Sequence, residues 1–438
     1  MEREGSPTPP PPAKRPRDSS PTTIHSLTDD LLLRIFLCLP SLATLVRAAL
    51  ACRAWRRAVV SSPDFRRRFR ELHPAPLLGL FFEAPSPVHD PALPAFPSFV
   101  PARRRERDLS VALRGGDFFL TCLQQHPSMA HSWEILDCRG GYVLLCNVDQ
   151  TSAQAMAVVN PLARQCRLFD YGHVDTFEGC RGTPIGRNAC LLCSEEEPAS
   201  FRVVLLVHDE SRVRATVFSS ETCEWKIHPW VDVPERPRRS KSWLLNSNMQ
   251  SNGFFYWVYK NYKYMVTLNM ATMEFSAEEL PQFLKNRCCS FSVGETNNGV
   301  RCIAYATDFT VGVMLRRTDG DGTEKWMLDR ATPLDAQLDG VLRKQKRNYD
   351  ELLVLAVRDG FVYLATSTKI SDSANPSWFL SLCLETMKLE NLFQRTYDGP
   401  ARPYVMAWPR CLVTNNGCSP LDASMKCIKC LQRRKERI

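Results

Sequence analysis

Cysteine and histidine residues are the first candidates for chemistry, because these side chains hold metals and act as nucleophiles or bases in proteins. Cys427 and Cys430 have the spacing of zinc ligands, and Cys190 and Cys193 repeat that spacing. The two pairs are more than 230 residues apart, and positions three apart in a strand point to opposite faces of its sheet. We therefore expect ordinary thiols and no bound metal or other cofactor.

The other polar motifs give little support to catalysis. None of the eight histidines has a recognisable metal-binding spacing, and the chain has no Gly-Lys-Ser/Thr loop to hold phosphate. The acidic run Glu195–Glu197 is typical of a solvated loop. A propeller enzyme that hydrolyses glycans needs convergent carboxylates on inner strands, and the pattern singles out no such set. The sequence therefore predicts no catalytic residues and a protein that is not an enzyme.

The composition is that of a folded protein with more than one hydrophobic core. Its 438 residues are 44% hydrophobic and 24% charged, which are ordinary globular values. The 18 cysteines lie in apolar segments without the regular spacing of a disulfide framework. No apolar run approaches the roughly 20 residues of a membrane helix, and the N-terminus is polar. We therefore expect a soluble, unsecreted protein of the nucleus, the cytoplasm or both, with no membrane partner.

The net charge of +9 comes from local clusters rather than from one basic face. Residues 1–22 contain many prolines and almost no apolar side chains, so we predict a disordered Pro/Ser-rich basic tail there. Its cluster Lys14, Arg15, Pro16 and Arg17 matches a nuclear import signal, although short basic clusters also occur by chance in solvated tails.

Residues 23–72 predict a small helical module. Thr28 can cap a helix whose first turn holds two aspartates and which ends at Pro40. Two or three further short helices follow, the last of them opened by Pro63. So few residues cannot enclose all of the module's apolar side chains. We therefore expect part of its apolar surface to contact a partner or the next domain.

The remaining chain divides into a Pro-rich linker at 73–108, expected to pack on the next domain, a β-rich domain at 109–415 and a basic tail at 416–438. In the β-rich domain a pattern of strand, polar turn and strand recurs at intervals of 59, 50, 51 and 63 positions. The anchor residues of the five copies are Ala163, Thr222, Thr272, Thr323 and Thr386. A period near 50 residues with about four strands per copy is typical of propeller blades.

Segments near the two ends of the β-rich domain supply a sixth copy. They are the flanks around Phe118–Leu120, Trp133–Leu136 and Tyr404–Met406. Strands paired from the two ends would close the ring and remove its open edges. We therefore predict a mainly β protein in which the helical module is followed by a β-propeller of about six blades. The alternative is a β-sandwich, or two stacked β domains, with fortuitous spacing.

The segment from Leu27 to Phe69 resembles an F-box, the adaptor-binding motif of SCF-type ubiquitin ligases. The residues that carry this resemblance are Leu27, Asp30–Leu32, Ile35–Phe36, Leu39–Pro40, Leu42, Leu45, Arg47–Ala48, Ala51–Arg56 and Ser62–Phe65. Thr28 departs from the family, which usually has proline after the first leucine, but threonine caps a helix well.

The resemblance implies that one set of apolar residues contacts a Skp-family adaptor and, through it, a cullin-RING scaffold. These residues are Leu27, Leu31, Leu32, Ile35, Phe36, Leu39, Pro40, Leu42, Leu45 and Val46. Helix-in-groove recognition uses apolar faces of this kind, so the physical interpretation agrees. The alternative is that these side chains pack into the module's own core or onto the propeller. We expect a second set to form that core, namely Leu50, Cys52, Trp55, Val59 and Phe65.

The β-rich part, including Ser132–Gly141, is similar to the F-box-associated propeller region of plant F-box proteins, particularly those of grasses. In that family the propeller is taken to select the substrate. The blade pattern does not identify this substrate, because recognition lies in the loops between strands. The resemblance therefore implies a non-catalytic substrate receptor, which presents a protein target for ubiquitination.

The alternative function is a nucleic-acid-binding regulator that uses the Arg-rich helical module. Arg53, Arg56, Arg57 and the run Arg66–Arg68 motivate it, together with the net charge of +9. Against it, the first helix starts with acidic residues and is otherwise apolar, whereas a groove reader needs exposed polar side chains that reach the bases. We therefore do not expect nucleic acid among the partners.

Overall fold

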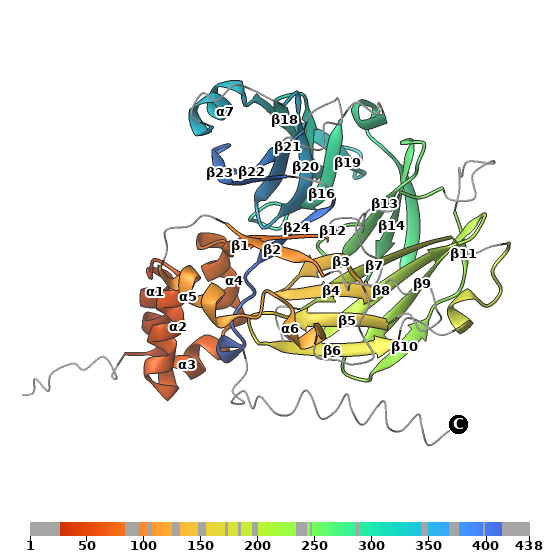
Figure 1. The fold of residues 1–438 in the computed structure, drawn as a ribbon. Coiled ribbons are helices and arrows are strands. Elements are labelled where there is room, and N and C mark those ends of the chain that lie inside the picture. Colours follow the sequence, from red (N-terminus) through yellow and green to blue (C-terminus); the bar gives the residue numbers. More distant parts are fainter. Residues whose placement is uncertain are drawn as a thin grey trace, which may run out of the picture.

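The computed structural model describes most of the chain between Leu27 and Val413. The described ranges are 27–83, 96–102, 107–124, 132–147, 155–170, 174–182, 185–194, 200–233, 243–245, 248–285, 289–342, 349–367, 376–396 and 399–413. The predicted tails at 1–22 and 416–438, including Lys14–Arg17, lie outside them. A small group of helices lies beside a larger domain of twisted sheets (Figure 1).

Four helices build the module at the start of the chain. They are α1 (Asp29–Leu37), α2 (Leu42–Ala51), α3 (Arg53–Val60) and α4 (Pro63–Leu72). Ser41 caps α2, because its hydroxyl accepts a hydrogen bond from the Thr44 N–H at 3.3 Å, and Ser62 caps α4 in the same way. Thr28 occupies the N-cap of α1 in an extended conformation, but its side chain makes no capping hydrogen bond. Thr28 therefore caps α1 only through its backbone carbonyl, which accepts a hydrogen bond from the Leu32 N–H.

Five four-stranded antiparallel sheets follow in sequence order, and each is one propeller blade. The first blade consists of β3 (Trp133–Arg139), β4 (Tyr142–Asn147), β5 (Ala155–Asn160) and β6 (Gln165–Asp170). The second consists of β7 (Ile185–Cys193), β8 (Phe201–His208), β9 (Arg212–Ser219) and β10 (Glu224–Ile227), with the short strand β11 (Val231–Asp232) as an additional partner of β9. The third consists of β12 (Met249–Ser251), β13 (Phe254–Val258), β14 (Tyr264–Asn269) and β15 (Glu274–Glu279), and the fourth of β16 (Ser290–Glu295), β17 (Arg301–Thr307), β18 (Thr310–Thr318) and β19 (Glu324–Pro333). The fifth consists of β20 (Glu351–Arg358), β21 (Phe361–Ser367), β22 (Pro376–Cys383) and β23 (Leu389–Thr396).

The sixth sheet joins the two ends of the described chain. It consists of β1 (Leu77–Phe82), β2 (Ser98–Pro101) and β24 (Ala401–Val405), in the order β2-β1-β24. Gly79 pairs with Tyr404 and Phe81 pairs with Arg402, so β1, which precedes the five blades in the sequence, is hydrogen-bonded to β24, the last described strand. This pairing closes the ring, because β24 lies against β3 of the first blade and β20 of the fifth. The predicted mainly β fold with a six-bladed propeller is confirmed.

The boundaries within this fold differ from the prediction in two places. The segment 73–108 was expected to be a linker packed on the propeller, but it supplies β1 and β2 of the sixth blade. Trp133–Leu136 and Phe118–Leu120 were expected in the sixth blade. The first of these belongs to β3, and the second lies between the short helices α5 (Arg107–Gly115) and α6 (Thr121–Gln124). The reason is that β1 is buried along its whole length and so lacks the alternation that marks a half-buried strand.

The repeat in the sequence corresponds to the turn between the third and fourth strands of each blade. The residue that follows the anchor has a positive φ in four blades, at Arg164 (52°), Cys223 (60°), Met273 (60°) and Met387 (51°). A single left-handed residue at this point closes a tight turn between antiparallel strands. The conserved spacing of the pattern therefore reflects one turn geometry repeated around the ring.

Hydrophobic cores lie between neighbouring blades rather than within one sheet. One core combines strands of the second and third blades, where Val204, Phe255, Trp257 and Val266 are buried, and another lies between the fourth and fifth blades. Each blade therefore contributes both faces to cores, as a propeller requires. Among the helices that the structure describes, none is long and apolar enough to cross a membrane.

Candidate functional site

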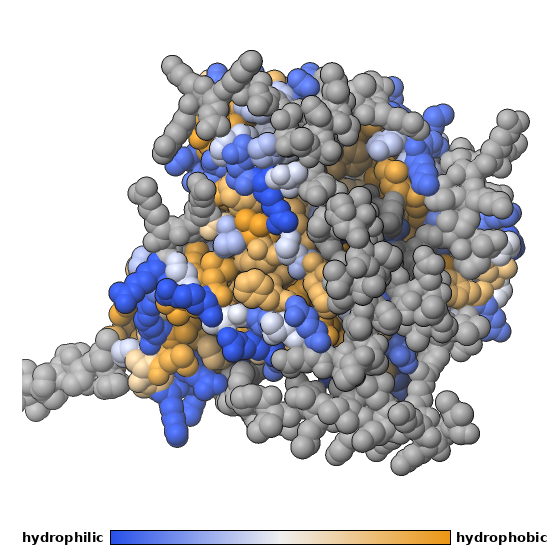
Figure 2. Space-filling view, in the orientation of Figure 1, coloured by the Kyte–Doolittle hydropathy of each residue, from blue (hydrophilic) through white to orange (hydrophobic). Residues whose placement is uncertain are grey.

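The helical module exposes large apolar side chains on its first two helices. Leu31 and Ile35 are each 48% exposed on α1, where their spacing of four residues places them on one face, and Leu50 of α2 is 52% exposed. Pro40, in the turn between the two helices, is also exposed. Figure 2 shows apolar surface on this module, bordered by hydrophilic side chains. Exposed apolar groups gathered in this way mark an interaction site.

The structure sorts the predicted adaptor-binding residues into two groups. Leu32, Phe36 and Leu45 are buried in the module's own core, so their prediction as surface contacts is wrong for this structure. They face α3 and α4, and Phe36 packs edge-on against Trp55 with ring centroids 5.8 Å apart. The remaining predicted residues are exposed or half-buried; besides Leu31, Ile35 and Pro40 they are Leu27, Leu39, Leu42 and Val46.

The residues that were predicted to form the module's core also differ in their exposure. Val59 and Phe65 are buried, whereas Trp55 and Cys52 are half-buried. Leu50 was predicted to lie in the core but is exposed, because the buried face of α2 is formed by Leu45 and Ala49. Leu50 is therefore a further exposed apolar residue of the module.

Two of the arginines that motivated a nucleic-acid interface are used inside the protein. Arg66 is 2% exposed and donates to the Val59 and Val60 carbonyls at the end of α3. Arg56 donates to the Cys411 carbonyl at 2.9 Å, and Arg67 pairs with Asp64 at 2.8 Å. Arg53, Arg57, Arg67 and Arg68 are exposed, and Arg67 is paired with the likewise exposed Asp64. Arg56 and Arg66 are therefore not available to a nucleic acid.

A segment that follows the last propeller strand fixes the module to the propeller. Trp408 packs against Phe69 of α4 with ring centroids 6.0 Å apart, and the Arg70 guanidinium lies 4.9 Å from its ring centre. Leu412, in the 3-10 turn η4 (Arg410–Leu412), is fully buried in the module's core. Arg410 binds Tyr142 and Gln165 of the first blade. The module's exposed apolar face is therefore held in a defined orientation relative to the propeller.

Replacing Trp408 by alanine is expected to loosen this junction by about 2 kcal/mol, because a half-buried aromatic side chain and its contact with Arg70 are lost. Amide hydrogen exchange in α4 should then become about 10-fold to 30-fold faster. Exchange in β13 and β14, on another side of the propeller, should stay unchanged. Trp225→Ala is the matched control, because Trp225 packs within the blades against Phe169 and Phe218. Equal exchange in α4 of both variants would contradict the assigned role of Trp408.

A cavity of about 510 Å³ lies at the junction between the module and the propeller. The end of α4 contributes Arg70 and His73, and the hairpin turns of several blades contribute residues such as Asn252 and Asn297. These turns join the first and second strands of their blades. Because the end of α4 lines the same cavity, the helical module lies on the face of the propeller that these turns form. The cavity opens at its base into the central channel, because Arg139 and Arg358 line both.

The channel is crossed by Arg358, from the end of β20. Its guanidinium donates to Asp137 Oδ1 and to the Pro403 carbonyl, each at 3.3 Å, and also to the Cys138 carbonyl. Asp137 Oδ2 accepts the Leu191 N–H at 2.9 Å. A single arginine and its carboxylate partner therefore connect the first, second, fifth and sixth blades.

Arg139 forms the second connection across the channel. It lies 3.5 Å from Glu295 of the fourth blade and donates to the Gln250 carbonyl of the third at 3.3 Å. Burial raises the pKa of Glu295. The positive charge of the nearby Arg139 acts in the opposite direction but does not cancel this increase. The Gln250 side-chain carbonyl is buried and has no hydrogen-bond partner among the described residues. The channel is thus a polar, charged interior. Arg139 lies in the segment Ser132–Gly141 that carries the family resemblance, but Glu295 and Gln250 do not lie in any segment that the sequence pattern marks.

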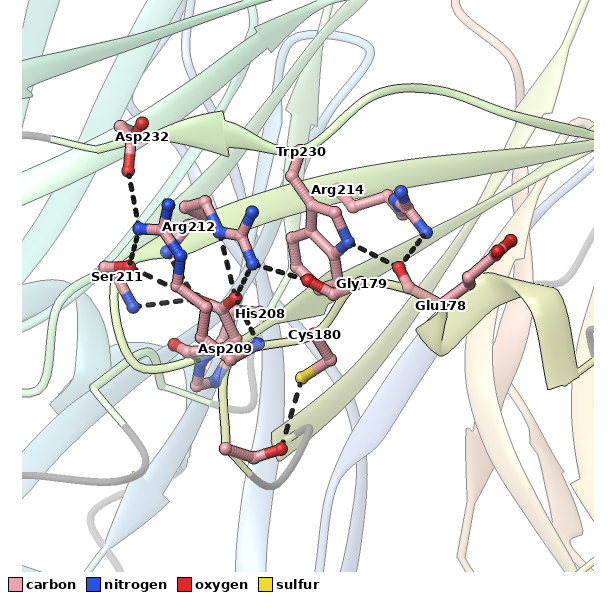
Figure 3. A network of polar contacts seen from close by, with 12 residues as sticks. Glu178, Gly179, Cys180, His208, Asp209, Ser211, Arg212, Arg214, Trp230 and Asp232 are labelled. Carbon is pink, nitrogen blue, oxygen red and sulfur yellow. Dashed lines mark hydrogen bonds and ion pairs between the residues drawn. The ribbon is translucent and has the colours of Figure 1, made fainter.

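A second polar network lies at the opposite end of the second blade, around the turn from β8 to β9 (Figure 3). The Asp209 carboxylate is fully buried and accepts hydrogen bonds from the Ser211, Arg212 and Arg181 N–H groups at 2.8, 2.7 and 3.1 Å. The Arg212 guanidinium also binds it, at 2.7 Å. Burial alone raises the pKa of Asp209, but these hydrogen bonds outweigh it and hold the pKa below its usual value.

Trp230 lies on the outer side of this network. The guanidinium groups of Arg212 and Arg214 lie 5.0 and 4.7 Å from its ring centre, and its indole N–H donates to the Glu178 carbonyl at 2.9 Å. Arg214 donates to the same carbonyl at 3.0 Å. These contacts fasten the connection that follows the 3-10 turn η2 (Val174–Phe177) to the blade. The network therefore has a structural role at the face turned away from the helical module.

Several cysteines of the propeller show the chemistry of buried thiols. Burial raises the pKa of Cys138 and Cys193 to about 12, and it raises that of Cys190 as well. A thiol that stays protonated is a poor nucleophile and metal ligand. Within the described part of the chain, no group of three or more His, Cys, Asp or Glu residues is placed to hold a metal ion. The pair Cys427 and Cys430 and the run Glu195–Glu197 lie outside the described residues.

The arrangement defines an F-box-like helical domain carried on a six-bladed propeller, and comparison with known families supports both parts. Residues 25–71 match the F-box-like family. Residues 134–411 match the family described as F-box protein AT5G49610-like, beta-propeller. This second match covers more than half of the chain, so the protein belongs to that family. Domains of this kind are typical of non-catalytic subunits that bind a Skp-family adaptor in cullin-RING complexes. No curated protein matches the sequence.

Solved propeller structures show only distant similarity. The N-terminal domain of Nup159 is 12% identical with a TM-score of 0.27, and the match covers 62% of this chain and 60% of that one. The periplasmic gluconolactonase PpgL of Pseudomonas aeruginosa is 10% identical with a TM-score of 0.33, covering 62% and 71%. This chain thus spans about 60% of the length of the first of these structures. TM-scores this low support no inference from these proteins to this chain.

Proposed function

We propose that this protein is the substrate-receptor subunit of an SCF-type cullin-RING ubiquitin ligase. The observation that carries the proposal is the exposure of the apolar residues Leu31, Ile35 and Leu50 on an F-box-like domain whose core also contains Leu412, from the segment after the last propeller strand. These side chains contact the Skp-family adaptor, while the propeller binds a protein target. The receptor performs no bond chemistry; it raises the effective concentration of a target lysine near a ubiquitin carrier.

The proposal includes the origin and the cellular location of the protein. The likeness of Ser132–Gly141 to plant, grass-type F-box proteins supports a plant origin. The reduced, buried thiols are compatible with the nucleus and the cytoplasm, where ubiquitin ligases of this class work. The Lys14–Arg17 cluster supplies an import signal. No observation favours the alternative of a nucleic-acid-binding regulator.

Replacing both Leu31 and Ile35 by aspartate is expected to weaken adaptor binding at least 100-fold, because two apolar anchors are lost and two charges must be desolvated. Co-purification of the full chain with a Skp-family adaptor, followed by titration calorimetry, measures this loss. Both residues are about half exposed in the free protein, so the fold should tolerate the change.

Leu72→Asp is the matched control for this experiment. Leu72 is likewise a large, exposed apolar residue of the module, but it lies at the end of α4 next to the propeller. The control variant should bind the adaptor like the native chain. The proposal fails if the native chain does not bind the adaptor, or if the double variant binds it as tightly as the native chain does.

A further inference from the structure

The outermost strand of the fourth blade, β19, carries an exposed apolar pair that the proposed function does not use. β19 is the last strand of its sheet, in the order β16-β17-β18-β19, so no described strand pairs with its outer edge. Met327 and Leu328 are adjacent on it and are 44% and 59% exposed. With ten residues β19 is long for an edge strand. Such edges are protected in most proteins, since they pair readily with other strands.

The charges around this pair are self-complementary. Counting outward from Met327, the residues two positions away are Lys325 and Asp329, and those three positions away are Glu324 and Arg330. Each position therefore carries a charge opposite to that of its mirror position. Two copies of β19 placed antiparallel about Met327 bring Lys325 opposite Asp329 and Glu324 opposite Arg330, twice each. Opposite charges across neighbouring strands stabilise the pairing.

We propose that β19 pairs antiparallel with β19 of a second copy of this chain, about a two-fold axis through Met327. The two Met327 side chains face each other at the centre, and Trp326 of each copy faces Leu328 of the other. Four charge pairs flank this apolar centre. The interface is isologous, as in most homodimers, and it covers the unpaired edge of β19 in both copies.

Two features of β19 set the extent of this pairing. The register with β18 shifts between Val313 and Met314, which leaves Asp329 as the extra residue of a bulge. A bulge bends and twists its strand, so the regular backbone ladder between the copies spans only Trp326–Leu328, and longer side chains bridge the copies beyond it. We therefore expect a weak dimer, half formed at about 10–100 µM chain.

Lys325 and Arg330 are available for such contacts, whereas the Asp329 side chain is only 15% exposed and Glu324 also binds Arg301 and Arg316 of its own copy. Lys325 is 53% exposed and bonds to Asp319 in the turn of the same hairpin, while Arg330 is 44% exposed and bonds to Asp329. Exposed ion pairs of this kind contribute little to stability, so sharing them with a second copy costs little. Asp329 also binds Arg317, and this contact holds its carboxylate at the bulge.

Sedimentation equilibrium on the full chain between 1 and 200 µM tests the proposal. The measurement is made on the native chain and on the Leu31→Asp plus Ile35→Asp variant, because the adaptor-binding face is itself apolar. Both proteins should dimerise equally. Met327→Glu plus Leu328→Glu should raise the dissociation constant at least 30-fold, whereas Val111→Glu, which alters an exposed apolar residue of α5, should leave it unchanged.

Two charge variants test the register. Lys325→Glu places two acids opposite each other and Asp329→Lys places two bases opposite each other, so each variant alone should be monomeric. An equimolar mixture should regain a heterodimer, because Glu at 325 of one copy then faces Lys at 329 of the other. Thermal unfolding and adaptor binding of each variant confirm that it is folded.

Three results would overturn the proposal. The first is a native chain that stays monomeric at 200 µM, which would leave the edge of β19 to a target peptide or to another segment of this chain. The second is a dimer that persists after Met327 and Leu328 are replaced. The third is a charge-variant mixture that does not associate while the native chain does. None of these results bears on adaptor binding, so the proposed function is tested separately.

Discussion

Replacing Arg358 by alanine is expected to lower the free energy of unfolding by about 3–5 kcal/mol, because its removal leaves a buried carboxylate without its charge partner. Arg358 and Asp137 both have side chains that are largely buried in the central channel. The Asp137 carboxylate would then keep only its backbone partners, the Leu191 and Cys138 N–H groups. The carbonyls of Cys138 and Pro403 would lose a donor as well.

Urea unfolding followed by tryptophan fluorescence measures this loss, and Arg202→Ala is the control. Arg202 lies exposed on β8, so its replacement should change the free energy of unfolding by less than about 0.5 kcal/mol. Arg358→Met combined with Asp137→Asn should recover part of the loss, since neither residue then carries a charge into the channel. A loss below 1 kcal/mol for Arg358→Ala would show that the arginine does not hold the blades together.

The regular part of the propeller could be predicted from the sequence because its signal is local. Four of the five copies of the repeat mark a turn with one left-handed residue after the anchor, as at Arg164 and Met273, and such a turn fixes its neighbouring strands. The sixth blade lacks this signal. Its strands β1 and β24 pair across most of the chain, and β1 is buried on both faces within a Pro-rich segment. Closure of the ring is a long-range event that no local pattern encodes.

The adaptor face could be predicted only in outline. The helical periodicity identifies α1 and α2 as amphipathic, but both have more apolar residues than one face can hold. Leu31 and Leu32 are adjacent, and only the packing of α1 on α3 and α4 decides that Leu32 is buried while Leu31 is exposed. The same holds for Leu50, whose exposure depends on the position of Leu45 and Ala49 against the core.

The polar networks could not be predicted from the sequence at all. Arg358 and Asp137 are 221 positions apart, and although Asp137 lies in the segment Ser132–Gly141 that carries the family resemblance, nothing there indicates its partner. Their pairing follows from the ring geometry, which brings the inner strands of all blades to one channel. Asp209 is different, because its partners Ser211 and Arg212 are near in sequence and form a turn of the kind that Asp favours. An Asp-x-Ser-Arg sequence between two apolar strands could have signalled this turn, but not the burial of its carboxylate.

Replacing Asp209 by alanine is expected to lower the free energy of unfolding by about 3–5 kcal/mol at pH 7, because the Arg212 guanidinium loses its buried partner and three backbone N–H groups lose their acceptor. The pH dependence follows from the lowered pKa of Asp209. A carboxyl whose pKa is lower in the folded chain stabilises the fold above its unfolded pKa near 3.9, and this contribution is lost as the pH falls through the folded value. The native chain should therefore remain more stable than the variant throughout the range from pH 7 down to about pH 4.

His208 adds a separate effect that the measurement must distinguish. Burial lowers the pKa of His208, so its protonation costs stability already as the pH falls below about 6.5. The Asp209 carboxylate counteracts this lowering, so the loss is larger in the Asp209→Ala variant, and the difference between the two proteins grows below about pH 6.5. Urea unfolding of both proteins between pH 7 and 3.5 gives this difference directly. Asp232→Ala is the matched control, because the exposed Asp232 lies 3.7 Å from Arg181 and contributes little. A difference that already disappears between pH 6 and 5 would contradict the assignment, because the stability would then come from a group with a raised pKa rather than from the hydrogen-bonded Asp209 carboxylate.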